Sequence, residues 1–498
     1  MSVGPPWARG EGPRRQKRAS PRRCASAVRG HTRRLAPRIS PPVRTRRGEI
    51  EAPAKPVDAA RFATEDAGSN PAVSTRKAMF EPRPRRVRGS DGAPSGRSGS
   101  PIIVHQVTSW REAIPVSTRM GPKQLTKRAI PGRYRDPAKR LYYRTLTTAK
   151  RQAILAGRVR RQAERCREQG SPLYAGLLER TAVDVEAGGP CWDVLRGHEI
   201  GPPAVVGGLP LRFLAAVHLL VLRGDAPALA PYYPSVGGIA NEGSWPAFAA
   251  TVDQHRQELQ GLLEHSCQTN AVGRCAALVG GFLVAARDTG RPIRQFEPGA
   301  SAGLNLRWDH YRYEIDGAAW GNPASPVRLA NRVVSGRPPF EVATQVIERA
   351  GCDLAPLDPA CADDQVALLS FTWADQEERL SLVRGALEVA ERVPVVVERA
   401  EASEWVASKL EAKRPGALTI VFHSFLTRYL DERSLHRLLS AIEEAGKRAS
   451  ESVPLAWLRM EGGQKSAELR LTMWPGGDTR LLAVSGNQGN DIHWLASD

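Results

Sequence analysis

The sequence has few cysteines and histidines, and neither residue type forms a pattern of metal ligands. Its 498 residues include 7 cysteines and 10 histidines, and no two cysteines form a Cys-x-x-Cys pair. Structural zinc sites need ligands at such short spacings. We therefore expect no metal site, and we expect the thiols to be free in a reducing cytoplasm.

Long apolar runs are also absent. The most apolar stretch, Val205–Leu222, is interrupted by Arg212 and His218, whereas a membrane-spanning helix takes about 20 consecutive apolar residues. No apolar segment of the kind found in secretory signals follows Met1. The sequence thus predicts a cytoplasmic protein that does not cross a membrane.

The positive charge is confined to the first part of the chain. The formal net charge is +19, and residues 1–140 hold 32 Lys+Arg against 10 Asp+Glu. This segment is rich in Arg, Pro, Gly and Ser and lacks apolar periodicity, so it is predicted to be disordered. Beyond residue 140 the charge is slightly negative, and we do not expect that body to bind nucleic acid.

One stretch of the basic segment bears on where the natural protein starts. Residues Glu65–Lys77 resemble the peptide obtained when a transfer-RNA gene is translated by mistake. We therefore expect that the natural product begins near Met120 or later, and that residues 1–140 are extraneous.

Residues 145–290 carry helical patterns and no convincing strand, which predicts an α-helical cap domain. Apolar residues recur at three-to-four spacing in four segments: Ala153–Glu168, Pro210–Leu222, Trp245–His265 and Ala276–Arg287. Thr269 or Asn270 is expected to cap the last of these helices, which Gly290 ends.

Residues 291–498 alternate between strand and helix patterns. The predicted strands are Ile293–Phe296, Val366–Trp373, Val393–Val397, Leu418–Phe422 and Leu455–Met460, with a terminal hairpin of Leu469–Trp474 and Arg480–Val484. Helical patterns follow at Glu377–Glu391, Ser403–Lys413 and Leu435–Lys447. Such alternation predicts an α/β fold with a Rossmann-like, mostly parallel sheet and an antiparallel C-terminal hairpin. An insertion at about 307–365 is expected to carry a hairpin around Gly317.

The segment Phe296–Leu306 (FEPGASAGLNL) fits two chemistries. As Gly-x-Ser-x-Gly, it matches the nucleophile elbow of serine hydrolases, with Ser301 as nucleophile. As an acid followed by Gly-x-Ser-x-Gly after a first strand, it matches a loop that holds a nucleotide cofactor. In that interpretation Glu297, Gly299, Ser301, Gly303 and Asn305 bind the cofactor.

Later strands are expected to bring ligand residues to the same edge of the sheet. Asp375 after the second predicted strand is suited to ribose hydroxyls, and Glu401 after the third to an adenine amino group. His423 after the fourth is the candidate general base, with Ser424 and Tyr429 shaping the pocket.

The hydrolase interpretation uses the same residues differently. Downstream of Ser301 the order of acid and histidine, Asp375 with His423 or His493, suits a catalytic triad. Two features oppose it: the sheet begins at this loop, and no His-Gly-Gly oxyanion segment precedes it. A third alternative is a binding protein without catalytic activity.

The order of acids and glycines resembles the S-adenosylmethionine-dependent methyltransferases of Rossmann-like fold. That resemblance implies S-adenosylmethionine as cofactor and methyl transfer to an unknown small molecule. The chain departs from the family pattern in having Ser301 at the middle glycine position and a long insertion before the second strand.

Residues 150–495 also resemble a narrower group, the bacterial proteins called domain of unknown function 2332. The motifs are Gly170–Tyr174 (GSPLY), Gln268–Arg274 (QTNAVGR), Gly299–Leu306, Gly351–Asp358 (GCDLAPLD) and Phe422–Ser424 (FHS). We expect Asn270, Arg274, Asp353 and Asp358, which lie in these motifs, to bind substrate.

Overall fold

A computed structural model describes residues 145–198, 208–462 and 466–496. These described residues belong to one compact unit. The basic segment 1–140, for which disorder is predicted, lies outside the described residues. Within the described ranges, none of the helices has the length and apolarity needed to cross a membrane.

The described helices that come first in the chain pack around a core of their own. Leu155, Leu178, Phe213 and Phe248 are each fully buried in this helical cluster. The predicted helix 245–265 is in fact two helices, because the backbone leaves the helical conformation at His255. The helices are α2 (Thr148–Glu168), α3 (Pro172–Ala187), α4 (Pro190–Leu195), α6 (Leu209–Arg223), α7 (Ser244–Gln254) and α8 (Arg256–Leu262).

Helix α9 (Cys275–Thr289) packs against the sheet instead. A Cβ atom on Gly281 would lie 2.4 Å from Leu458 Cδ1, and one on Gly280 would lie 2.5 Å from the Trp494 ring. These two glycines therefore let the helix approach the strands closely. The helix ends at Gly290, whose φ of 62° is the left-handed conformation expected of a C-cap glycine.

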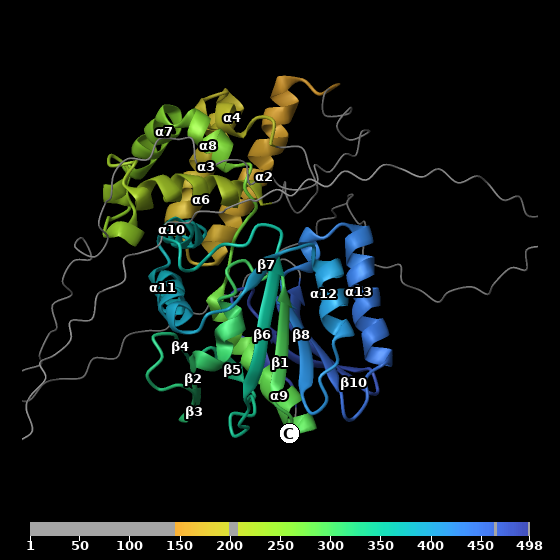
Figure 1. Ribbon diagram of the computed structural model, residues 1–498. Helices are drawn as coiled ribbons and strands as arrows, with labels where there is room; N and C mark the ends of the chain where they lie inside the picture. The colour runs from red at the N-terminus through yellow and green to blue at the C-terminus, as the bar shows by residue number, and fades with distance from the viewer. Residues whose placement is uncertain (1–144, 199–207, 463–465, 497–498) are drawn as a thin grey trace, which may run out of the picture. The chain divides into compact units, whose positions relative to one another are not determined.

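A nine-stranded sheet runs in the order β5-β12-β11-β10-β9-β8-β1-β6-β7. The strands from β7 to β9 are parallel, and β10, β11 and β12 are antiparallel to their predecessors. This arrangement confirms the predicted fold class (Figure 1). The strands are β1 (Ile293–Pro298), β5 (Val333–Ser335), β6 (Val346–Asp353), β7 (Val397–Arg399), β8 (Leu418–Ser424), β9 (Leu455–Gly462), β10 (Ala467–Trp474), β11 (Asp478–Ser485) and β12 (Ile492–Trp494).

Alternate residues of the central strands feed two cores. In β8, Ile420 and Phe422 pack with α9 and α11 (Glu377–Arg392) on one face. Val421 points to the other face, where α12 (Ala402–Glu411) and α13 (Glu432–Lys447) lie side by side (Figure 1). Because consecutive side chains of a strand point to opposite faces, a strand that is covered on both faces needs apolar residues at successive positions.

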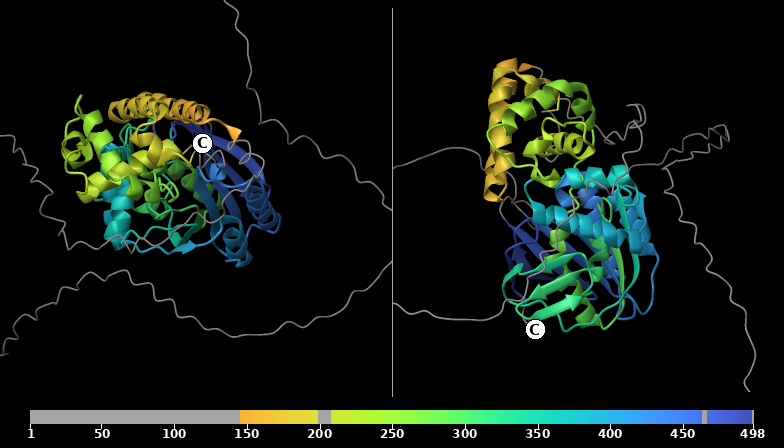
Figure 2. Two further views of the ribbon diagram at one scale, coloured as in Figure 1. Left: turned by 90° about the horizontal axis from the view of Figure 1, so that it is seen from above. Right: turned by 90° about the vertical axis from the view of Figure 1, so that its left-hand side faces the viewer.

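The insertion after β1 builds a small sheet in the order β3-β2-β4. Strands β2 (Arg312–Ile315) and β3 (Ala318–Gly321) form the hairpin predicted around Gly317, and β4 (Arg328–Ala330) pairs with β2. The small sheet lies next to α11 in the right-hand view of Figure 2. The contact is close, since a Cβ atom on Gly385 would lie 2.8 Å from the Pro326 carbonyl oxygen.

The predicted strand Val366–Trp373 is wrong. Most of it belongs to helix α10 (Ala362–Ser370), whose first turn carries Asp363 and Asp364. Acidic side chains stabilise the positive N-terminal end of a helix, and this signal outweighed the apolar run that follows. The strand beside β1 is β6, which lies inside the predicted insertion.

The remaining short segments are 3₁₀ turns. They are η2 (Ala230–Tyr232), η3 (Pro234–Val236), η4 (Val272–Arg274), η5 (Asn305–His310) and η6 (Thr427–Tyr429). The helix cap predicted at Thr269 or Asn270 is also wrong, because α9 starts without a side-chain cap.

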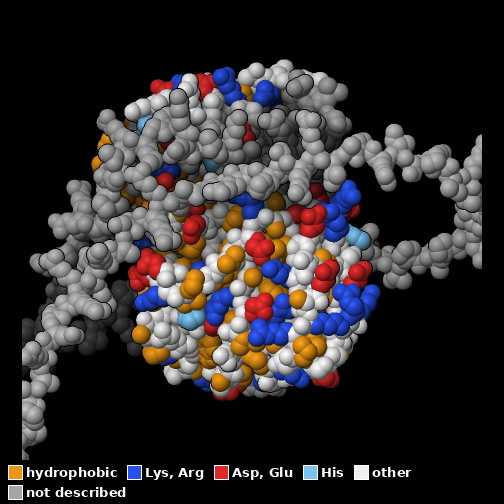
Figure 3. Space-filling view, viewed as in Figure 1, with side chains coloured by type: hydrophobic (Ala, Val, Ile, Leu, Met, Phe, Trp, Pro, Cys, Tyr) orange, Lys and Arg blue, Asp and Glu red, His pale blue; other side chains and the backbone are white. Residues whose placement is uncertain are grey.

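The surface gives no sign of a nucleic-acid track on the face that Figure 3 shows. On the described part of that face, basic and acidic side chains are interspersed. A phosphate backbone is bound by a continuous stripe of Lys and Arg.

Asp375 does not follow a strand, which corrects its predicted position at the edge of the sheet. Its carboxylate accepts hydrogen bonds from Ser171 Oγ (2.6 Å) and Leu173 N (3.0 Å) at the start of α3. Asp375 thereby caps a helix of the helical cluster and ties the segment between α10 and α11 to it.

Replacing Asp375 with Ala should lower the free energy of unfolding by about 2 kcal/mol, because two hydrogen bonds to a charged acceptor are lost. Urea denaturation of the full chain measures this value. Glu443→Ala, which removes an exposed carboxylate from α13, should change it by less than about 0.5 kcal/mol. Equal effects of the two substitutions would contradict the capping role.

Candidate ligand site at the carboxyl edge of strand β1

The loop after β1 alternates left-handed residues. Gly299, Ser301 and Gly303 have φ values of 73°, 56° and 69°. Glycine adopts this conformation without strain, whereas a serine there is uncommon. Ser301 therefore adopts a backbone conformation that glycine usually supplies, and the loop turns tightly at the end of the first strand.

Side chains from outside the loop hold this shape. Ser301 N donates to Asp353 Oδ2 at 3.0 Å, and Ser301 Oγ donates to Gln268 Oε1 at 2.5 Å. Leu304 N donates to Asn270 Oδ1 at 3.0 Å. The predicted residues Asn270 and Asp353 thus lie at the loop, and Asp353 stands at the carboxyl end of β6, the position that the sequence interpretation gave to Asp375.

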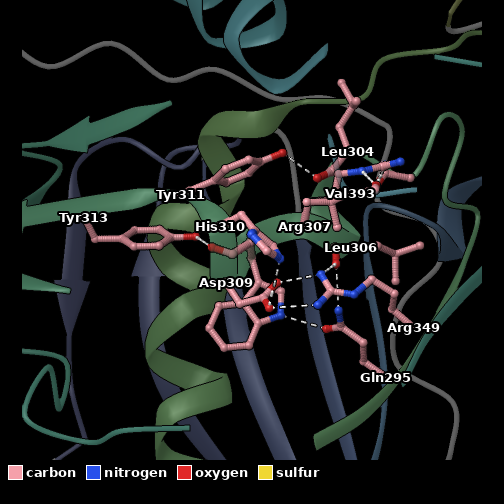
Figure 4. Close-up of polar contacts among 12 residues, drawn as sticks. Gln295, Leu304, Leu306, Arg307, Asp309, His310, Tyr311, Tyr313, Arg349 and Val393 are labelled. Atoms are coloured by element: carbon pink, nitrogen blue, oxygen red, sulfur yellow. Dashed lines mark hydrogen bonds and ion pairs between the residues drawn. The ribbon is translucent and has the colours of Figure 1, made fainter. Parts of the chain in front are cut away.

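A buried polar network supports the chain immediately after the loop (Figure 4). Gln295 accepts a hydrogen bond from Trp308 Nε1 and donates one to the Leu306 carbonyl, each at 2.7 Å. Arg349 of β6 binds Asp309 through two hydrogen bonds of 2.8 and 2.9 Å. These bonds fix η5 against β1 and β6, so the loop is anchored at both ends.

Glu297, the penultimate residue of β1, is a buried carboxyl group. Its side chain is 3% exposed, and Oε2 has no hydrogen-bond partner. Burial raises the pKa of Glu297 well above its usual value, while Arg274 and Asn305 oppose the shift. A carboxylate with an unused acceptor is costly inside a protein unless a ligand or a cation satisfies it.

Arg274 brings an opposite charge near Glu297. It donates to the Asn487 carbonyl (3.1 Å) and to Ser424 O and Oγ (3.2 and 3.3 Å), and its guanidinium lies 4.4 Å from the Phe425 ring. Within the described ranges, no carboxylate lies at ion-pair distance from Arg274. Burial lowers its pKa to about 10, so it stays charged at neutral pH.

Arg274 and Glu297 lie where the strand order reverses. The chain runs from β1 to β6 and β7 on one side, and then returns to β8 on the other side of β1. Open α/β sheets bind ligands outside the carboxyl ends of the strands at such a switch point.

His423 has no free ring nitrogen. Trp457 Nε1, which can only donate, bonds to His423 Nε2 at 3.0 Å. Nδ1 therefore carries the proton and donates it to Glu461 Oε1 at 2.8 Å. The imidazole is fully buried and joins β8 to β9, so in this arrangement it cannot accept a proton from a substrate.

Three other predicted residues have local contacts. Glu401 caps α12, accepting from Ser403 N (2.9 Å) and Glu404 N (3.1 Å). Asp358 is exposed and forms a turn with Ala360 N. Tyr429, in η6, is half exposed, and the nearby Cys267 raises the pKa of its hydroxyl.

Sequence reasoning missed the partners that hold the site. Gln268, Trp457 and Glu461 were assigned no role, although each bonds to a predicted residue. Glu461 lies near the carboxyl end of β9. An acid at the end of a predicted strand was the sequence feature that could have identified it as a site residue. The bond between Gln268 and Ser301 joins residues 33 apart, so no local pattern reveals it.

The geometry gives Ser301 no catalytic histidine. Its described partners are Gln268, Asp353 and Leu357 N, the last at 3.3 Å. His493 Nδ1 instead lies 2.9 Å from Ser335 Oγ. A serine nucleophile needs a base within hydrogen-bond reach, and the described residues supply none.

Residues 156–494 match the family model described as "uncharacterized protein conserved in bacteria" (DUF2332). The chain belongs to this family. The DUF2332 match begins within α2 and ends within β12, so it includes the glycine loop and every residue that contacts it. No curated protein and no solved structure matches the chain.

The pKa of Glu297 predicts a pH dependence of stability. Its pKa is higher in the folded than in the unfolded protein, so the folded state holds the extra proton between the two values. Stability is therefore lost as the pH rises through this window. Glu297→Gln stays neutral and should exceed the wild type in unfolding free energy by about 1–3 kcal/mol at high pH.

Urea denaturation at about pH 5 and about pH 8 measures this difference. It should be small at the lower pH and should grow toward the higher one. Glu443→Gln, an exposed residue of α13, should show no such trend. A difference between wild type and Glu297→Gln that is independent of pH would show that Glu297 is not a buried, proton-binding group.

Proposed function

We propose that this DUF2332 protein binds S-adenosylmethionine at the carboxyl edge of β1 and transfers its methyl group to a small molecule. The observation that carries the proposal is the pair of buried ionisable groups at the switch point, the Glu297 carboxyl group and the Arg274 guanidinium. Glu297 has an unpartnered oxygen, and Arg274 has no carboxylate partner within the described residues.

This pair suits the amino-acid end of the cofactor. An α-amino acid carries an ammonium and a carboxylate on one carbon atom. Glu297 would accept hydrogen bonds from the ammonium, and Arg274 would bind the carboxylate through its planar N–H groups. The ammonium would favour the ionised form of Glu297, and each buried group would gain a partner of opposite charge.

The acids at the next strand ends suit the nucleoside part. Asp353 already accepts from Ser301 N and Ala355 N, yet each carboxylate oxygen has room for a second donor such as a ribose hydroxyl. Glu401 follows β7, and its capping bonds all use Oε2, which leaves Oε1 for an adenine amino group. Asp375 has no part in this assignment, because it caps α3.

The bound cofactor supplies the activated methyl group, and the protein's task is alignment. The loop from Gly299 to Gly303 fixes the backbone on which the cofactor rests. Ser424 and Tyr429 stand beside Arg274 and would orient the acceptor. His423, held by Trp457 and Glu461, positions the end of β8 and is not assigned as the base.

A binding function without methyl transfer is the second candidate. The observation that favours it is that His423 uses both ring nitrogens within the protein. Cofactor binding would then persist, but no acceptor would be methylated.

Calorimetric titration of the full chain with S-adenosylmethionine tests the proposal. Wild type should bind, and Glu297→Gln and Arg274→Gln should each bind about tenfold more weakly or worse, since each loses a charge-assisted bond. Arg433→Gln, an exposed residue of α13, should bind as wild type does. Failure of the wild type to bind, or equal affinity of all variants, would refute the proposal.

A fluorophosphonate probe distinguishes the hydrolase alternative. Ser301 has no histidine to activate it, so the probe should leave the intact protein unlabelled. Ser301→Ala provides the matched control for any background labelling. Labelling that depends on Ser301 would favour a serine hydrolase over the cofactor site.

A further inference from the structure

The segment that holds the glycine loop also lines a separate cleft. Gln268 and Asn270 bond to the loop, and residues 269–273 form one wall of a small cleft that is partly open to solvent. The other walls come from α10, α11, the turn before β5 and the β11–β12 connection. The polar lining residues used below are Thr269, Arg332, Thr372, Arg379 and Gln488.

Two arginines give this cleft a positive charge. Arg332 is 11% exposed and pairs with Glu378, which is 76% exposed and therefore offsets little of the charge. Arg379 donates to Gln376 Oε1 at 2.5 Å and lies over the Trp373 ring. Among the described residues, no carboxylate is within ion-pair distance of Arg379.

Hydrogen-bonding capacity in the cleft is unused. Arg332 Nε, a hydrogen-bond donor, is buried without a partner. Gln488 Oε1 also has no partner, but it is an acceptor and does not attract an anion. Desolvation, together with Arg274 and Arg332, lowers the pKa of Arg379 to about 10. Two positive groups that repel one another, one of which keeps an unused donor, are stabilised by a shared anion.

We propose that this cleft binds an oxyanion, either a phosphate group or a carboxylate. Arg332 and Arg379 present planar N–H groups that match both anions, and Thr269 and Thr372 add hydroxyl donors. The small volume favours a free anion or the anionic end of a longer molecule. The site does not depend on the S-adenosylmethionine proposal, because none of its lining arginines is assigned to that cofactor.

Titration calorimetry of the full chain at constant ionic strength provides the test, with sodium phosphate, acetate and chloride as probes. Phosphate or acetate should bind saturably while chloride does not, and the preferred probe identifies the anion. Arg379→Gln should weaken binding about tenfold, and Arg379→Lys should lie between, since lysine keeps the charge without the planar fork. Arg392→Gln, at the exposed end of the same helix, should bind as wild type does.

Absence of saturable oxyanion binding by the wild type, or wild-type affinity in Arg379→Gln, would overturn the proposal. If Arg379→Gln fails to fold by circular dichroism, Thr372→Val replaces it and should also weaken binding. Arg379→Gln should keep its affinity for S-adenosylmethionine. The two proposals can therefore fail separately.

Discussion

The backbone reversal between Gly299 and Gly303 is the constraint on which the site depends. Three of its five residues are left-handed, and the serine among them costs about 1–2 kcal/mol relative to glycine. Hydrogen bonds that Ser301 and Leu304 donate to the side chains of Asp353, Gln268 and Asn270 offset that cost. The loop therefore keeps its shape only when β6, which carries Asp353, and the segment before α9, which carries Gln268 and Asn270, are folded beside it.

The same reversal explains why two ionisable groups are buried together. It follows directly after Glu297 and Pro298 at the end of β1, and it lets the segment before α9 pass close enough for Arg274 to reach Ser424 at the end of β8. Burial without full pairing is costly for both groups. Such unpaired buried groups are typical of sites where a bound ligand supplies the missing contacts. For this reason the proposed function centres on Glu297 and Arg274 at the switch point rather than on Ser301.

How far the sequence predicted this site depended on the burial of each strand. Strands β1, β8 and β9 are largely buried, and apolar residues dominate β8 and β9. Strand β6 is only partly buried and carries Glu348 and Arg349, whose charges are paired with Arg294 and Asp309. Those pairs form only in the folded chain, so β6 was missed and Asp375 was given the position of Asp353.

The candidate site residues fall into two groups, those predicted by local sequence and those whose chemistry depends on distant partners. Glu297, Ser301 and Gly303 follow from local spacing, because the loop is continuous in the chain. The position of His423 was also predicted, but its chemistry depends on Trp457 and Glu461, which are 34 and 38 residues away. Local sequence patterns thus locate the edge of the sheet. Whether a side chain at that edge can bind a ligand or is already hydrogen-bonded within the protein depends on tertiary contacts.

Amide hydrogen exchange with and without S-adenosylhomocysteine, the demethylated form of the cofactor, tests the central claim most directly. The account predicts slower exchange in peptides covering residues 296–306 and 267–275, with no change in α13. Unchanged exchange at the loop, or protection confined to other parts of the chain, would contradict the claim that the carboxyl edge of β1 is the ligand site.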